Sequence, residues 1–219
     1  MSARDEILAR VRAATADVTT PVGARGPVPV IEEISPGAAA TLELFAENVA
    51  DYRATVLRVP PAEIGSAVAG ALRDLGAASV VVPDGLDPAW RQAVAEVVTI
   101  HPESEATTSR DLEQVDAVVT ASALGIATTG TIVLDHGSDQ GRRELTLVPD
   151  THVCVIRADQ VVHDVPEAVT RLGGEAHRGR PLTWVSGPSA TSDIELQRVE
   201  GVHGPRTLVV VLVDNIAST

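Results

Sequence analysis

The order of hydrophobic and polar residues divides most of this sequence into alternating helices and strands. Apolar residues recur at helical spacing over residues 2–18, 37–50, 61–76, 87–97 and 165–173. Runs rich in valine, isoleucine and leucine predict strands near 55–59, 78–82, 117–120, 131–134, 145–148, 152–156, 182–186 and 207–213. Because apolar strands alternate with helices, we expect an open α/β fold: a single, mostly parallel sheet covered by helices on both faces.

Local sequence signals mark several of the predicted helix ends. Asp87 lies just before a proline, which is the usual order of an N-cap residue and a first helical residue. Gly76 closes the helix predicted over 61–76. Ser192 and Glu195 have the spacing of a capping box, so a short helix is expected to begin there.

The segment 135–143 is polar and is expected to form a hairpin or loop. It leads into the predicted strand 145–148, which we expect to pair in antiparallel fashion with the strand over 152–156. Cys154 stands between two valines in that second strand, so a buried thiol is predicted. His152 is expected at the end of the same strand.

Apolar runs are spread evenly along the 219 residues, which favours one large domain. Residues 1–40 are predicted to be an N-terminal helix and a variable connector, because 22–29 is rich in glycine and proline. Residues 41–219 are predicted to form the α/β domain.

The charge of the chain argues against nucleic acid as a partner. The formal net charge is −13, from 30 acidic and 17 basic residues. One Phe, one Tyr and two Trp cannot supply a stacking platform for bases. The N-terminus is charged where a secretory signal needs an apolar core, and no apolar run has membrane-spanning length, so we expect a cytoplasmic protein without a membrane partner.

Cofactor chemistry is restricted by what the sequence lacks. A single cysteine excludes an internal disulfide and a Cys-ligated iron–sulfur cluster within one chain. Neither the dinucleotide glycine fingerprint nor a P-loop occurs, and the six histidines are dispersed without a compact metal-ligand spacing. We therefore expect no bound iron, flavin, nicotinamide or other metal.

Two stretches next to predicted strands combine glycines with hydroxyl groups. One is Thr128-Thr129-Gly130, before the strand at 131–134, and the other runs from Ser186 to Pro205. Such groups can present several donors to an anion, and α/β sheets bind ligands at strand ends. We expect a small anion to contact Thr128, Thr129, Gly130, Gly187, Ser189, Thr191, Asp193, Glu195 and His203, with Arg178 or Arg180 adding positive charge.

Each of these candidates has a structural alternative. The threonines can instead form a tight turn in which they satisfy local backbone groups. Asp193 and Glu195 would repel an anion unless they cap a helix or bind arginine. His203, held between glycines, is either a structural residue or an acid–base group. The pattern names no catalytic residue.

Three segments together resemble a known family. They are Ala127–Val133 (ATTGTIV), Leu147–Pro149 with His152, and the loop from Gly187 to Pro205, which contains GPSATSDIE and GVHGP. The chain resembles the LUD-domain proteins, particularly the lactate-utilisation protein C type, over most of its length from about Leu42 onward. The resemblance implies a fold similar to that of glucosamine-phosphate deaminase, ribose-phosphate isomerase and the CoA transferases.

The resemblance also implies an accessory role in the oxidation of L-lactate to pyruvate, together with separate iron–sulfur subunits. The single cysteine is consistent with electron transfer in another chain. The sequence ends at Thr219 without the ferredoxin-like cysteine motifs of some longer LUD proteins, which favours the C type over the B type. By fold alone, the alternative is a free-standing isomerase or transferase acting on a small anionic substrate, phosphorylated or CoA-linked.

Overall fold

The computed structural model describes residues 3–17, 36–104, 107–174, 179–191, 199–200 and 204–214. The chain divides into two compact units, Met1–Ile34 and Ser35–Thr219. In the first unit, helix α1 (Ala3–Ala14) carries acidic residues in its first turn and Arg12 in its last, which suits the helix dipole. Its apolar side chains Ile7, Leu8 and Val11 are exposed.

A six-stranded sheet forms the centre of the second unit. Its strand order is β1-β12-β7-β4-β2-β3, and every neighbouring pair is parallel. The strands are β1 (Thr55–Val59), β2 (Ser79–Val82), β3 (Thr99–Pro102), β4 (Ala117–Thr120), β7 (Thr151–Arg157) and β12 (Thr207–Val213). Side chains of β4, β7 and β12 are almost all buried, as expected for parallel strands covered on both faces.

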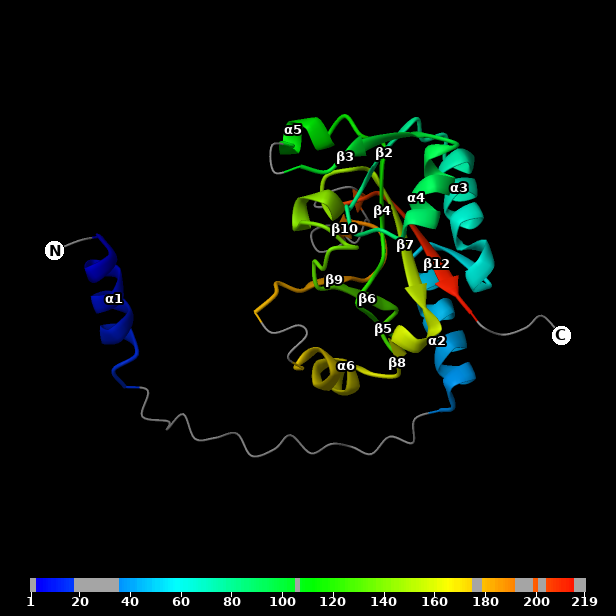
Figure 1. Cartoon of the computed structure of the whole chain (residues 1–219). Coiled ribbons are helices and arrows are strands. Elements are labelled where there is room, and N and C mark those ends of the chain that lie inside the picture. Colours follow the sequence, from blue (N-terminus) through cyan, green and yellow to red (C-terminus); the bar gives the residue numbers. More distant parts are fainter. Residues whose placement is uncertain are drawn as a thin grey trace. The chain divides into compact units, whose positions relative to one another are not determined.

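Helices cover the two faces of this sheet. On one face, α3 (Ile64–Asp74) and α4 (Pro88–Ala95) lie side by side (Figure 1). They pack on valines such as Val119 and Val153. On the other face, α2 (Ala38–Asp51) places Phe45 in a cluster with Cys154 and Val210. The predicted α/β fold with a mostly parallel sheet is therefore confirmed.

A second sheet, which the sequence did not predict, completes that other face. Its order is β8-β5-β6-β9, and β6 pairs antiparallel with both of its neighbours. The strands are β5 (Leu124–Ile126), β6 (Thr131–Leu134), β8 (Val161–Val162) and β9 (Thr183–Val185). Helix α6 (Val165–Leu172) packs against it through Ala168 and Leu172. A short antiparallel pair joins β10 (Ala190–Thr191) and β11 (Val199–Glu200).

The prediction of a strand over 145–148 is wrong. Residues Arg143–Thr146 form the 3-10 helix η2, which buries Leu145 against Val118 and Leu112. The expected antiparallel pairing with the next strand is also wrong, because β7 is paired in parallel on both sides, with β4 and β12. No side of β7 remains for a further strand. The other short helices are η1 (Pro61–Glu63), α5 (Ser109–Leu112) and η3 (Ala158–Gln160).

The predicted helix ends of α3 and α4 are confirmed. Asp87 accepts a hydrogen bond from the amide of Ala89 at 2.8 Å and so caps α4. Gly76 follows α3 with a positive φ of 69°. The amide of Ala77 donates to the carbonyl of Leu72 at 3.0 Å, which completes a Schellman-type end.

Two titratable side chains of β7 are enclosed in the core. Cys154 is buried as predicted, and burial raises the pKa of its thiol to about 12. His152 is the second residue of β7 and is 2% exposed, with its Nε2 atom 2.8 Å from Thr120 Oγ1. Burial lowers the pKa of this imidazole to about 4, so it is neutral at pH 7.

Two glycines let loops approach the C-terminal end of α2. Gly130 has φ 56°, and a Cβ atom there would lie 2.6 Å from the backbone carbon of Asn48. Gly187 has φ 79°, and a Cβ atom there would lie 2.4 Å from Tyr52 Cβ. Both positions therefore require glycine for conformation and for space.

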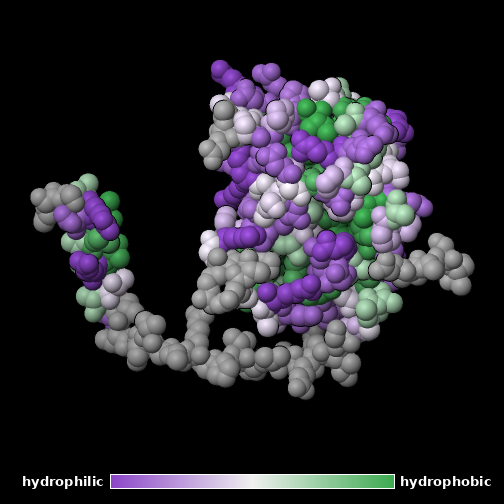
Figure 2. Space-filling model, in the orientation of Figure 1, coloured by the Kyte–Doolittle hydropathy of each residue, from purple (hydrophilic) through white to green (hydrophobic). Residues whose placement is uncertain are grey.

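The visible surface of the second unit is mainly hydrophilic, and hydrophobic residues appear on it in small separate areas (Figure 2). Its larger exposed apolar side chains include Val169, Leu182 and Trp184. Among the described residues, no helix is both long enough and apolar enough to cross a membrane.

Replacing His152 by glutamine is expected to make folding less sensitive to acid. The imidazole has a pKa of about 4 in the folded chain and 6.5 as its reference value. Between these values the unfolded chain binds a proton that the folded chain does not. The free energy of unfolding therefore falls as the pH drops through this window, by about 3 kcal/mol in total. Denaturant titrations of the wild type and of H152Q across this pH window measure the decrease in the free energy of unfolding. An equal decrease in the two proteins would contradict a buried neutral imidazole at His152.

Replacing Gly130 by alanine is expected to destabilise the protein by about 2–4 kcal/mol, because the methyl group meets the α2 backbone and φ is positive. Gly76→Ala is the matched control, since Gly76 also has a positive φ but has open space around it. The control should lose only about 1–2 kcal/mol. Equal losses in the two variants, measured by thermal or chemical unfolding, would show that the close approach to α2 is unimportant.

Candidate functional site

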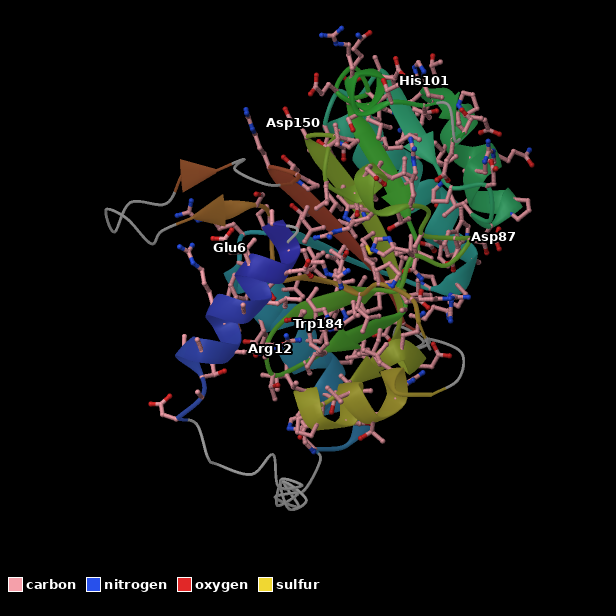
Figure 3. The ribbon with its side chains drawn as sticks, turned by 90° about the vertical axis from the view of Figure 1, so that its left-hand side faces the viewer. Glu6, Arg12, Asp87, His101, Asp150 and Trp184 are labelled. Atoms are coloured by element: carbon pink, nitrogen blue, oxygen red, sulfur yellow. The ribbon has the colours of Figure 1, made fainter. Side chains whose placement is uncertain are left out.

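The parallel sheet has two edges of different character. At its carboxyl edge the strands end, and helix N-termini begin nearby, as at Asp87 after β2. At its amino edge the strands begin, as at Asp150 before β7. Figure 3 labels both residues, Asp87 on the right and Asp150 on the left. Open α/β sheets bind ligands outside the carboxyl edge.

The described residues of the two predicted stretches meet near the amino edge. Thr131 Oγ1 lies 2.8 Å from Ser186 Oγ and 2.7 Å from Thr129 Oγ1. These contacts form a chain of hydroxyls between the turn before β6 and the end of β9. The amide of Ser189 donates to the carbonyl of Pro205, just before β12.

The remaining predicted residues are placed only in part. Thr128 is exposed in the turn, and its amide donates to the carbonyl of His163. Thr191 pairs with Val199 in the β10–β11 hairpin. Asp193, Glu195 and His203 lie outside the described residues, and so do Ser192 with its predicted helix and Arg178. A shared anion pocket of these residues therefore stays a prediction.

The surroundings of this hydroxyl chain are not those of a strong anion site. Gly130 and Gly187 both lie against the C-terminal end of α2, where a helix carries partial negative charge. Thr129 and Thr131 bond to each other, as in the structural alternative of a tight turn. Arg180, expected to add positive charge here, lies at the other end of β6, where it contacts Asp135.

A polar cavity of about 360 Å³ opens at the carboxyl edge, and we call it the carboxyl-edge pocket. It is lined by Gly85 after β2, Ala123 after β4 and Gln160 after β7. The loop after β6 contributes 135 and 137–140, and Arg180 completes the lining. Three parallel strands of the main sheet and one strand of the second sheet thus converge on one cavity.

Asp135 and Gln140 organise the loop after β6. Gln140 Oε1 accepts from the backbone amide of Asp135 at 2.7 Å, and its Nε2 atom donates to Asp135 Oδ1 at 2.8 Å. The amide of Gly137 donates to the same carboxylate oxygen at 3.2 Å. Arg180 Nη1 donates to the second oxygen at 2.9 Å. Both oxygens of a carboxylate that is 5% exposed are therefore occupied.

Further contacts attach this loop to the main sheet. The carbonyl of Ser138 accepts from the amide of Gly85 at 2.9 Å, and a Cβ atom at Gly85 would lie 2.5 Å from that oxygen. The carbonyl of Asp139 accepts from the amide of Ala121, just after β4. His136 has φ 54° and is held through both ring nitrogens, Nδ1 near the carbonyl of Gly141 and Nε2 near Thr183 Oγ1. A left-handed non-glycine residue next to a pocket is a feature often found at functional sites.

Sequence reasoning identified Arg180 as a possible anion partner but missed Asp135, Asp139 and Gln140. The polar segment that contains them was interpreted only as a connection between strands. The available signal was its position, since it follows directly on a buried strand. Among the described residues, no group of three or more His, Cys, Asp or Glu side chains is suited to hold a metal ion.

Comparison with known proteins identifies the family. The sequence model of one protein family, the LUD domain, matches residues 42–213 of this chain. The chain is 46% identical over 187 residues to the lactate utilization protein C of Deinococcus radiodurans, which covers 85% of each chain. The protein of the same name from Geobacillus kaustophilus is 28% identical over 167 residues, 69% of each chain.

A solved structure agrees with this assignment. The crystal structure of a DUF162 family protein from Deinococcus radiodurans matches with a TM-score of 0.68 and 39% identity, over 82% of this chain and 99% of that one. The structural match extends the sequence similarity to the arrangement of the strands and helices described above. The chain belongs to the LUD domain family.

Proposed function

We propose that this protein takes part in lactate utilisation as an accessory subunit that binds a small anion and acts with separate iron–sulfur subunits. The observation that carries the proposal is the 46% identity with a lactate utilization protein C over 85% of both chains. The LUD family model supports it as well, because its match to residues 42–213 spans the loops at both edges of the sheet and the core between them.

The cysteine content supports a division of labour between subunits. Lactate oxidation to pyruvate releases two electrons, and this chain has a single cysteine, Cys154. Its thiol is fully buried, with its pKa raised to about 12 by burial, so it is neither a ready nucleophile nor an accessible thiolate ligand. We infer that the electrons are carried by iron–sulfur centres in partner subunits.

The carboxyl-edge pocket supports the binding of a small anion. Arg180 is half-exposed at the cavity, and its guanidinium is oriented by the buried carboxylate of Asp135. A guanidinium fixed in this way suits the recognition of carboxylate groups. The residues that the sequence predicts to bind an anion, including Thr129 and His203, are the second place where an anion is proposed to bind.

Deleting the gene is expected to abolish growth on L-lactate but not on a carbon source that bypasses lactate. The wild-type chain should restore growth, and affinity purification of a tagged copy should recover iron–sulfur proteins with it. Cys154→Ala is the matched control, because it removes the only thiol without removing a proposed ligand contact, and it should restore growth fully.

Two results would contradict the proposal. Unimpaired growth of the deletion strain on L-lactate would exclude an essential role in lactate utilisation. Purification without any protein that contains iron and acid-labile sulfide would exclude the accessory role.

A further inference from the structure

We propose that the carboxyl-edge pocket binds a small 2-hydroxycarboxylate, whose carboxylate contacts Arg180 and whose hydroxyl group donates to Asp139. This inference rests on the proposed function in lactate utilisation, and it adds the location of the ligand and the chemical class that the site selects. The proposed site is expected to bind 2-hydroxy acids more tightly than the corresponding 2-oxo acids.

Arg180 is the cation of this site. Its Nη1 atom donates to Asp135 Oδ2 at 2.9 Å, and its side chain remains 48% exposed at the cavity. A guanidinium has five N–H donors in one plane, so a side chain that uses one for Asp135 can hold a second carboxylate. The planar geometry allows two parallel hydrogen bonds to that ligand carboxylate.

Asp135 and Gln140 act as positioning residues. The two side chains bond to each other, and Gln140 Oε1 also accepts from the amide of Asp135. Their hydrogen-bonding groups are thus directed at the loop itself and at Arg180. They set the orientation of the guanidinium. Gln140 Nε2 also donates to Asp139 Oδ1 at 3.3 Å, which holds this half-buried carboxylate at the cavity with its second oxygen as the acceptor proposed for the ligand.

Asp139 gives the pocket a preference for a hydroxyl group. An ionised carboxylate can only accept hydrogen bonds. The hydroxyl of a 2-hydroxy acid can donate to it, whereas the oxygen of a 2-oxo acid would face it without a hydrogen between them. A site that pairs its polar group with a ligand hydroxyl rejects analogues that lack the donor. Lactate should therefore bind and pyruvate should bind more weakly.

The spacing of the charged atoms matches such a ligand. A Cβ atom built on Gly137 would lie 3.3 Å from each of Arg180 Nη1, Asp135 Oδ1 and Asp139 Oδ1. The arginine and Asp139 atoms are consequently no more than twice this distance apart. The carboxylate and hydroxyl of a 2-hydroxy acid sit on adjacent carbons and can span that gap. Gly137 has no side chain at this point, where a single Cβ atom would already contact all three charged atoms.

Calorimetry on the full chain tests the inference with L-lactate, pyruvate and propionate at matched ionic strength. L-Lactate is expected to bind about tenfold or more tightly than pyruvate or propionate, because each of these lacks the hydroxyl donor. Arg180→Gln should weaken lactate binding at least about tenfold, since it removes the charged partner of the carboxylate. Arg206→Gln is the matched control: it removes the same charge from an exposed ion pair with Asp150 at the amino edge, and it should leave binding unchanged.

Two further variants probe the geometry. Asp139→Asn should bring lactate and pyruvate to similar affinities, because an amide can donate to an oxo group. Gly137→Ala should weaken lactate binding without changing any charge, since its methyl group would fill the space between Arg180 and Asp139. Circular dichroism verifies that each variant is folded.

The inference is overturned if lactate does not bind, if pyruvate binds equally well, or if Arg180→Gln binds lactate like the wild type. Loss of binding in Thr129→Ala or His203→Gln with normal binding in Arg180→Gln would favour the site that the sequence predicts around those two residues instead. The growth assay stays independent: a chain that is required on L-lactate but does not bind it would retain the proposed function and refute this site.

Discussion

The pairing of β7 with β12 is the constraint on which the α/β unit depends. Seven consecutive residues of each strand are in register, and almost all of their side chains are buried. Two parallel strands that are buried on both faces have apolar side chains on both, so each face must be packed against another apolar layer. Helices α3 and α4 supply one cover, and α2 with the second sheet supplies the other. His152 is neutral because it lies inside this arrangement rather than at its margin.

The same pairing makes the two edges of the sheet electrostatically unequal. With every strand parallel, helices that connect them begin at the carboxyl edge and end at the amino edge. The polar loops at the carboxyl edge enclose the cavity with Arg180, while the hydroxyl chain of Thr129, Thr131 and Ser186 lies beside the end of α2. Both regions are rich in donors, but the first has a fixed cation among its lining residues.

The strands that sequence patterns predicted well are the long buried ones. The runs 207–213 and 152–156 are apolar after their first residues, Thr207 and His152, so nothing in them suggests another structure. Strand β3 was missed because His101 and Pro102 interrupt its apolar pattern, and β5 and β8 because three and two residues give no periodicity. The run 145–148 was predicted to be a strand because it is apolar. The 3-10 helix η2 buries Leu145 equally well without any strand pairing.

The candidate site was harder to predict than the core, because its contacts join distant residues. Arg180 and Asp135 are 45 positions apart, and only the antiparallel pairing of β6 with β9 brings them together. Local glycine and hydroxyl content pointed to the amino edge instead. Gly130 and Gly187 have a packing explanation that no sequence pattern distinguishes from a role in ligand contact.

The hydrogen bonds between Asp135 and Gln140 hold the loop after β6 in one conformation, and this affects how a ligand would bind. They close the loop after β6 on itself, and Ser138 and Asp139 attach it to the ends of the main sheet. A molecule that enters the cavity meets donors and acceptors already in position, so little conformational entropy is lost when it arrives. A preorganised site needs no slow closing of a lid before it binds, which favours fast association.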